Sequence, residues 1–438
     1  MPQNTVFFPL RLLDANSLFY NPATELLRLF DGVDQPETPK LRTIVNQKPD
    51  VYPTPRLKAL AKINPFRVMT VMRRAAELEA GGKKIVHMEV GEPDFNTATP
   101  IVDAAKRALN AGFTHYTDAA GINELRCAIA GHYLERYGVS VDKERILVTP
   151  GASGGLSLLA NLLVGQNDGV LITDPAYPCV RNFIQIMNGR PQLVPVDGTQ
   201  NFQPTVQLLE DSADASTCGL WLASPSNPTG SVLSREALTG ICRWCSEKDL
   251  HVLVDEIYHG LHYVADLPSV LEVDDSAFVV NSFSKYFGMT GWRLGWIVVP
   301  DYAVEKARVL AQNFYISPSS IAQHAALAGF SEETRIILER RRQCFRERRD
   351  FLSTSLREIG LSLAEEVQGA FYIYADISRF SENSERFCSD MLESHGVAIT
   401  PGTDFGEFRA ENFVRFAFTT GMDDLALGVE RLRRALQG

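Results

Sequence analysis

Lys285 is the side chain best placed for covalent chemistry. It lies just past the apolar run 278–280, in the segment NSFSKYFGMTGWR. Ser282 and Ser284 flank it, and Arg293 follows eight residues later. A lysine attacks a carbonyl group only when its amine is neutral, and its free pKa is about 10.4, so the site must lower that pKa by burial or by a second cation. Taken alone, the segment also fits a solvated loop, where most lysines are found.

Asp255 directly ends another apolar run, VLV at 252–254. A buried carboxylate without a partner is costly, so this residue needs one. The protonated nitrogen of a pyridine ring would serve, and so would a helix N-cap or an internal ion pair. Tyr258, three residues later, and Asn227 in SPSNPTG could both hydrogen-bond an oxygen on the same ring.

Two further patterns suit anions. The segment PGASGG at 150–155 opens a predicted helix, whose free N–H groups and positive end favour a phosphate, although the same residues also form plain turns. Arg415 lies inside the apolar strand FVRFAFTT, and its planar guanidinium fits a carboxylate or an internal acidic partner. Tyr177 in DPAYP could either stack on an aromatic ring or pack in a turn.

The elements that position these residues are short apolar runs separated by amphipathic helices. The runs are 146–149, 170–173, 220–223, 252–254, 278–280 and 295–299. Continuous runs of this kind predict a mostly parallel sheet buried on both faces, in an α/β fold. Ligands of such sheets bind beyond the carboxyl ends of the strands, where the polar residues occur. After about residue 325, a long charged helix, strands and a final helix indicate a smaller α+β domain.

Composition excludes some classes of function. With 43 Lys and Arg against 53 Asp and Glu, the net charge of −10 argues against nucleic-acid binding. The arginine cluster between Arg340 and Arg349 is therefore interpreted as a solvated helix face. Seven cysteines at irregular spacing indicate reduced thiols in a cytoplasmic protein, and the single CxxC at Cys242 and Cys245 predicts no metal site. We expect neither a secretory signal nor a membrane span.

Taken together, the motifs resemble those of class I/II aminotransferases, which are fold-type I enzymes dependent on pyridoxal 5′-phosphate and related to aspartate and alanine transaminases. The matching segments, in the family's order over residues 57–437, are GEPDF, HYTDAAGINELR, TPGASGG, DPAYP, SPSNPTG, VDEIY, SFSKYFGMTGWRLGW and the RFAF strand. The resemblance implies a large cofactor-binding domain at 96–325, with a mostly parallel seven-stranded sheet flanked by helices. A small domain would combine 57–95 with 326–438, and 1–56 would form an arm.

The resemblance also implies a role for each candidate residue. Lys285 would hold the cofactor as an imine and later move the substrate proton, while Asp255 would keep the pyridine nitrogen protonated. The other expected contacts are Tyr258 and Asn227 to the ring oxygen, Tyr177 to the ring face, Ala152, Ser153, Ser282, Ser284 and Arg293 to the phosphate, Tyr116 to the phosphate of the other subunit of a homodimer, and Gly91, Asn227 and Arg415 to the substrate.

The predicted reaction exchanges an amino group between an L-amino acid and a 2-oxo acid. Because the loop GASGG lacks the lysine that often binds a second carboxylate in related aspartate transaminases, we expect a neutral or aromatic donor, with 2-oxoglutarate or pyruvate as acceptor. A dicarboxylate donor stays an alternative, since another cation could replace that lysine. A carbon–sulfur β-lyase is an alternative, because elimination uses the same residues. A cofactor-binding regulator fused to a DNA-binding module is a second one, although residues 1–56 lack the required basic character.

Overall fold

The computed structural model describes residues 60, 63, 65–364 and 366–437. The predicted arm at residues 1–56 lies outside this set. In the described part of the chain, no helix is both long and apolar enough to cross a lipid bilayer.

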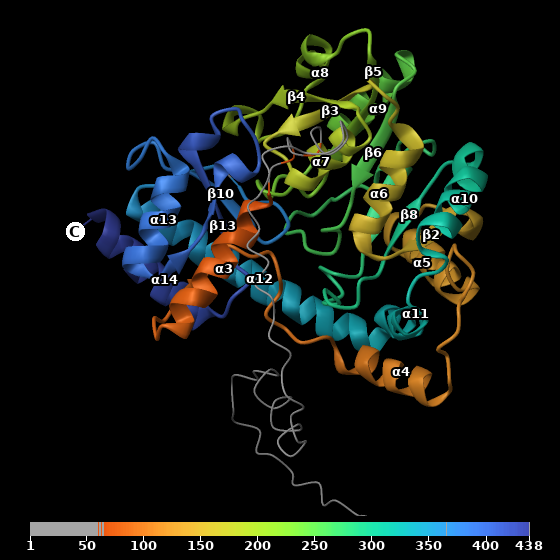
Figure 1. The fold of residues 1–438 in the computed structure, drawn as a ribbon, viewed down its shortest axis with the longest axis horizontal. Coiled ribbons are helices and arrows are strands. Elements are labelled where there is room, and N and C mark those ends of the chain that lie inside the picture. Colours follow the sequence, from red (N-terminus) through yellow and green to blue (C-terminus); the bar gives the residue numbers. More distant parts are fainter. Residues whose placement is uncertain (1–59, 61–62, 64, 365, 438) are drawn as a thin grey trace, which may run out of the picture. The chain divides into compact units, whose positions relative to one another are not determined.

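A seven-stranded sheet forms the centre of the α/β fold (Figure 1). Its strands are β2 (Ile146–Thr149), β3 (Gly169–Asp174), β4 (Arg190–Pro195), β5 (Thr217–Ala223), β6 (His251–Asp255), β7 (Phe278–Ser282) and β8 (Gly295–Val298). Their order is β2-β8-β7-β6-β5-β3-β4, and β8 alone runs antiparallel to its neighbours. The prediction of a mostly parallel sheet from apolar runs is confirmed for six strands. The seven strands that the family resemblance implied are present, although no apolar run marked the seventh, β4, because this edge strand carries two prolines and alternates in burial.

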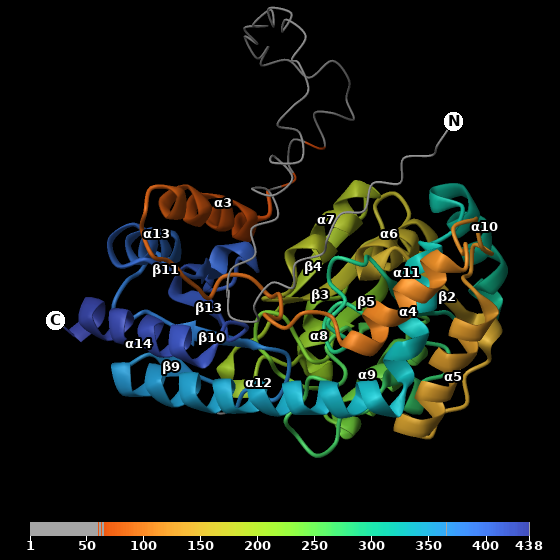
Figure 2. The ribbon, with the colours of Figure 1, turned by 90° about the horizontal axis from the view of Figure 1, so that it is seen from below.

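Helices cover both faces of this sheet. Val252 and Val254 of β6 pack in a cluster with helices α5 (Asn123–Tyr137) and α9 (Arg235–Glu247), whereas Leu253 packs with α6 (Gly151–Leu163) and α10 (Val304–Tyr315). Neighbouring residues of a strand therefore fill opposite cores, as expected for a strand buried on both faces. Figure 2 shows β3 and β5 between α6 and α7 (Pro178–Ile186) on one side and α9 on the other.

A second, antiparallel sheet has the order β12-β13-β10-β9. Its strands are β9 (Ser362–Leu363), β10 (Tyr372–Asp376), β12 (Thr400–Pro401) and β13 (Phe413–Ala417), and a separate pair joins β1 (Val86–His87) to β11 (Val397–Ala398). The surrounding helices are α3 (Arg67–Ala80), α12 (Glu332–Ile359), α13 (Ser384–His395) and α14 (Met422–Gln437). The remaining helices of eight or more residues in the described part are α4 (Thr99–Asn110) and α11 (Ser320–Leu327). Figures 1 and 2 show α12 running from α14 to the helices beside the seven-stranded sheet.

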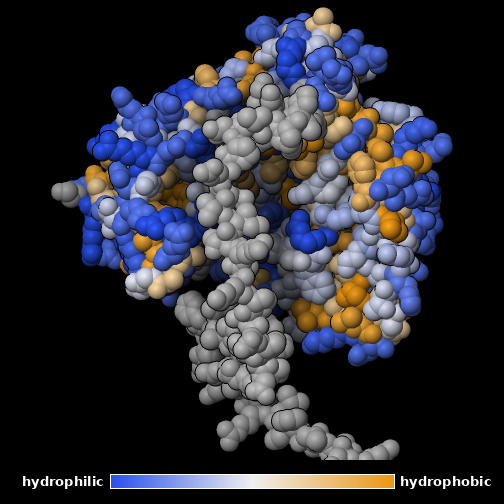
Figure 3. Space-filling model, in the orientation of Figure 1, coloured by the Kyte–Doolittle hydropathy of each residue, from blue (hydrophilic) through white to orange (hydrophobic). Residues whose placement is uncertain are grey.

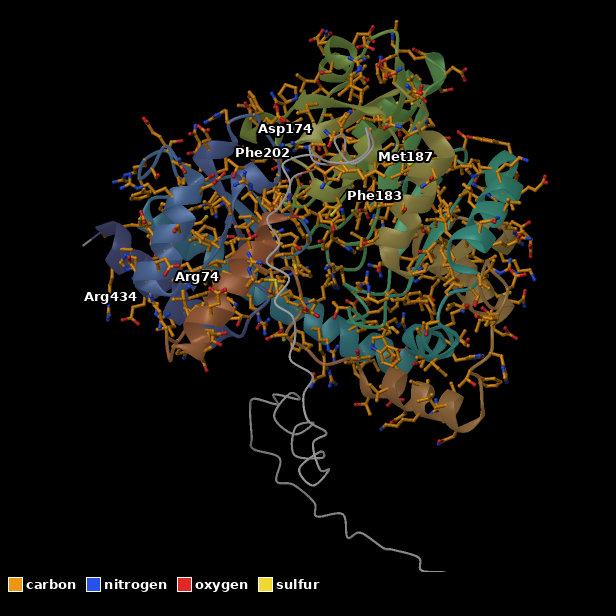
Figure 4. The ribbon with its side chains drawn as sticks, viewed as in Figure 1. Arg74, Asp174, Phe183, Met187, Phe202 and Arg434 are labelled. Atoms are coloured by element: carbon orange, nitrogen blue, oxygen red, sulfur yellow. The ribbon has the colours of Figure 1, made fainter. Side chains whose placement is uncertain are left out.

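Two buried polar side chains, Asp174 and Arg348, make contacts between segments that lie far apart in the chain. Asp174, at the end of β3 (Figure 4), accepts the N–H groups of Glu407 and Phe408 at 3.0 Å. Arg348 of α12 donates two 2.8 Å hydrogen bonds to the carboxylate of Asp94. The interpretation of the arginine cluster as a solvated face is therefore wrong for Arg348, which is buried.

Helix α3 is fixed at its start by Asp404. The carboxylate of Asp404 accepts the N–H groups of Arg67 at 2.9 Å and Val68 at 3.3 Å, which would otherwise lack partners. Further along the helix, Arg74 (Figure 4) donates a 2.6 Å hydrogen bond to Glu393 of α13. Asp404 therefore sets the position of the first turn of α3.

Replacing this cap should weaken the fold measurably. We expect Asp404→Ala to lower the free energy of unfolding by about 1 kcal/mol, because two amide groups lose their acceptor. Asp404→Asn keeps an acceptor oxygen and should lose less. Urea denaturation followed by circular dichroism measures both variants, and equal losses in the two would contradict the capping role.

Candidate active site

A cavity of about 380 Å³ lies where the parallel strands end. Residues from both sheets line it, and eleven of the thirteen predicted site residues are among them. These eleven are Gly91, Ala152, Ser153, Tyr177, Asn227, Asp255, Tyr258, Ser284, Lys285, Arg293 and Arg415. The cavity therefore collects residues that are more than 300 positions apart in the chain.

Lys285 extends from the loop after β7 into this cavity. Its Nζ donates a 2.7 Å hydrogen bond to the carbonyl oxygen of Gly91. Burial lowers the pKa of Lys285 to about 8; the nearby Glu92 opposes this change, whereas Arg415 and Arg293 add to it. A substantial fraction of the amine is therefore neutral near pH 8, as a nucleophile or base requires.

Asp255 occupies the last position of β6 and is buried. One carboxylate oxygen accepts the N–H of Ile257 at 3.0 Å. Burial raises the pKa of Asp255 to about 7, which the Ile257 hydrogen bond and the charge of Lys285 only partly offset. A cationic ligand in the cavity would stabilise the ionised form.

The first turn of α6 and Arg293 form a candidate anion site. No side chain caps this helix, so its first N–H groups are available to a ligand. Arg293 has a φ of 53°, a left-handed conformation that is uncommon for a residue with a side chain, and its Nη1 donates to the carbonyl of Thr290 at 2.9 Å. A Cβ at Gly151 would lie 2.7 Å from Arg293 Nη2, so glycine allows the guanidinium to approach the helix start. Ser284 completes this part of the wall.

Arg415 approaches the cavity from β13 of the other sheet. It is only 2% exposed, and no carboxylate in the described residues forms an ion pair with it. Its Nη1 donates to Asn227 Oδ1 at 2.9 Å, and its Nη2 donates to the carbonyl of Glu89. Of the two sequence-based interpretations, the internal ion pair is therefore not observed. A buried guanidinium of this kind suits an incoming carboxylate.

Tyr372 is a cavity residue that the sequence analysis missed. Its ring lies 4.2 Å below the Arg415 guanidinium, and its hydroxyl is 3.0 Å from that of Tyr258. Gly91 is needed opposite this hydroxyl, because a Cβ there would come within 1.7 Å of it. The alternation in FYIYADI could have indicated which face of the strand Tyr372 occupies, but not that this face meets the cavity.

Two predicted residues do not line the cavity. Ser282 is buried, and its hydroxyl is 3.0 Å from Ser284 Oγ and 3.1 Å from the carbonyl of Leu294. The hydroxyl of Ser282 therefore holds the hydroxyl of Ser284 in place without lining the cavity itself. Tyr116 is 80% exposed on the surface. Tyr177 does line the cavity, with its ring edge-on to Phe66 at 5.9 Å between centroids.

The cavity thus combines a partly neutral lysine, a buried carboxyl group, an anion site and a separate guanidinium. The first three suit one ligand with an electrophilic carbon, a basic nitrogen and a phosphate. The guanidinium suits the carboxylate of a second molecule. This combination is typical of amino-acid chemistry carried out with an organic cofactor.

Comparisons with known proteins agree with this chemistry. The family described as "Aminotransferase class I and II" matches residues 83–432. A valine–pyruvate aminotransferase of Mycobacterium tuberculosis is 37% identical over 86% of this chain and 98% of its own length. An aspartate aminotransferase of Pyrococcus horikoshii is 32% identical over 86% of this chain and 96% of its own.

Solved structures show the same architecture. The structure of Thermus thermophilus aspartate aminotransferase with maleate has a TM-score of 0.83 and 32% identity, and the match covers 88% of this chain and all of that one. An aminotransferase from Mycobacterium tuberculosis gives a TM-score of 0.83 at 37% identity, over 86% of this chain and 98% of its own. The fold is that of the fold-type I aminotransferases, as the resemblance implied. The chain belongs to the class I and II aminotransferase family.

Proposed function

We propose that the cavity binds pyridoxal 5′-phosphate and exchanges amino groups between an L-amino acid and a 2-oxo acid. The chain is an aminotransferase by family, and the family's enzymes depend on this cofactor. The observation that carries the proposal is the position of Lys285, whose amine, with its pKa lowered to about 8, lies in one cavity with Asp255 and an anion site.

The residues present fit this cofactor. The uncapped start of α6 at Ala152 and Ser153, with Ser284 and Arg293, matches the phosphate. Asp255 matches the pyridine nitrogen, because a protonated ring nitrogen would offset the burial that raises the pKa of this carboxyl group. The other proposed contacts are Lys285 to the reactive carbon, Tyr258 and Asn227 to the ring oxygen, and Tyr177 to the ring face.

When bound, the cofactor supplies an electron-poor ring that accepts the electrons of a broken Cα–H bond. The chain's own residues do the remaining work. Arg415, with Asn227 beside it, binds and orients the α-carboxylate of the substrate. The neutral amine of Lys285 takes the α-proton and returns it, as general base and then general acid. Asp255 keeps the ring nitrogen protonated, so that the ring stays electron-poor.

We further propose a homodimer in the cytoplasm. Tyr116, at 80% exposure, would reach the phosphate of the partner subunit. The other large apolar side chains exposed in the described part include Leu109, Phe113, Phe314 and Ile316. Figure 3 shows more apolar surface on the side that carries α6 and α11 than on the side of α13. Such a surface supports association with a second copy.

The domain limits predicted from the sequence are retained as part of this proposal. The large domain would comprise residues 96–325, and the small domain would combine 57–95 with 326–438. Pairing of β1 with β11 supports this division, because it joins the beginning of the proposed small domain to its end.

The alternatives are less well supported. The relatives reported above are named as aminotransferases, which does not favour a carbon–sulfur β-lyase. Their names divide between valine and aspartate as donor, so the names alone do not identify the substrate.

The pKa of Lys285 can be tested without the cofactor. In the folded apoprotein, the rate of acetylation of Lys285 should rise with pH with a midpoint near 8, because burial disfavours the protonated amine. In the urea-unfolded protein the midpoint should return to about 10.4. Competitive labelling followed by mass spectrometry measures both, and a folded-state midpoint at or above 10 would contradict the assignment.

The role of Lys285 can be tested with the loaded protein. The purified protein should be yellow, and a suitable amino acid should bleach the visible absorbance. Lys285→Ala should lower turnover by roughly 100- to 10,000-fold, because the proton then has no positioned base. The exposed Lys106 provides a control, since Lys106→Ala should keep full activity. Normal turnover by Lys285→Ala would overturn the proposal.

The proposed binding of the substrate carboxylate by Arg415 can be tested by measuring kcat/KM and KM. Arg415→Gln should lower kcat/KM by roughly 100-fold or more, mainly through KM, because the substrate carboxylate loses a buried cationic partner. Arg409→Gln removes a partly exposed guanidinium that pairs with Asp376 and should leave kcat/KM within about twofold. An Arg415→Gln variant with unchanged KM would show that the carboxylate binds elsewhere.

A further inference from the structure

One part of the cavity wall has no role in the proposed binding of the cofactor or the α-carboxylate. It is formed mainly by the start of α3, where Phe66, Met69 and Met72 line the cavity. These residues are three positions apart, a spacing that places them on one face of a helix. Leu156 and Ile257 add apolar surface to the same cavity. The free part of the wall is therefore largely apolar.

Each cation that lines the cavity already has a partner in the proposed function. Among the described residues, its cations are Lys285, Arg293 and Arg415, which the proposed function assigns to the reactive carbon, the phosphate and the α-carboxylate. The acidic residues are Asp255 and Glu92, and Glu92 accepts a 2.5 Å hydrogen bond from the hydroxyl of Thr290. Within one subunit, a second carboxylate on a substrate would therefore meet apolar side chains and a like charge, without a cation of its own in the described part of the chain.

We propose that both substrates are monocarboxylates, namely an L-amino acid with an apolar side chain and a neutral 2-oxo acid, and that Met72 of α3 determines this specificity. The inference rests on the proposed function. Enclosing an unpaired carboxylate is unfavourable, whereas the flexible thioether side chains of methionine adapt to apolar groups of different shape. A second carboxylate is equally unfavourable on the acceptor, because the α-carboxylate of the 2-oxo acid binds the same Arg415 in the second half of the reaction.

A half-reaction screen tests the substrate class on the loaded enzyme. Leucine, methionine and phenylalanine should change the cofactor absorbance with kcat/KM values roughly 100-fold above those of aspartate and glutamate. With the amine form of the enzyme, pyruvate and 4-methyl-2-oxopentanoate should likewise exceed 2-oxoglutarate. Dicarboxylates that react as fast as apolar substrates would overturn this inference and leave the aminotransferase proposal intact. Absence of any spectral change with all twenty amino acids would instead refute the proposed function.

Substitutions on α3 test whether this helix contacts the side chain of the substrate. Met72→Lys places a cation on the apolar wall and should raise kcat/KM for glutamate at least roughly tenfold while lowering it for leucine. The matched control is Thr70→Lys, which adds the same charge at an exposed position of α3 that does not line the cavity. This control should leave the preference unchanged. An equal gain in both variants, or a gain in neither, would show that this face of α3 does not contact the substrate side chain.

A binding measurement complements the variants and needs no turnover. By calorimetry, the unreactive 4-methylpentanoate should bind the loaded wild-type enzyme more tightly than glutarate. Met72→Ala should weaken 4-methylpentanoate and leave acetate unchanged, because only the longer ligand reaches α3. Tighter binding of glutarate to the wild-type enzyme would overturn the inference even if the lysine variant fails to fold.

Discussion

The cavity depends on one physical constraint, the enclosure of charged groups that have no ion-pair partner within the described residues. Asp255 and Arg415 are buried and Lys285 is partly buried, and none of the three forms a salt bridge with another described residue. Burial favours the neutral forms of Asp255 and Lys285. Arg415 contacts a backbone carbonyl, an amide oxygen and a tyrosine ring in place of a carboxylate. Such an arrangement is costly in isolation. It is explained if ligands supply the missing partners, a cation for Asp255 and a carboxylate for Arg415.

The scaffold holds these groups together from two directions. Asp255 and Lys285 lie at the carboxyl ends of β6 and β7, whereas Arg415 belongs to the antiparallel sheet. The hydrogen bond between Arg415 and Asn227 joins the two sheets inside the cavity itself. The contacts of Asp174 with Glu407 and Phe408 link β3 to the segment between β12 and β13, so the geometry of the site depends on how the sheets are joined.

The parallel strands and the polar residues at their ends could be predicted from the sequence, because both are marked by short, continuous segments of the chain. Buried parallel strands appear as continuous apolar runs, and the polar residues that follow them, such as Asp255 and Lys285, must meet at one edge. Long-range contacts could not be predicted in this way. Arg348 looked like part of a solvated helix face because its partner, Asp94, lies 254 residues away. Tyr372 was missed for a similar reason, since the pairing of β10 with β13 in the antiparallel sheet brings it to Arg415.

Lys285 is the residue to which we propose that the cofactor is covalently attached. Reduction of the native protein with borohydride, followed by peptide mapping in a mass spectrometer, tests this claim directly. We predict a stable pyridoxyl group on the peptide that contains Lys285 and on no other lysine. A pyridoxyl group on a different lysine, or an unmodified protein after incubation with excess pyridoxal 5′-phosphate, would contradict the account.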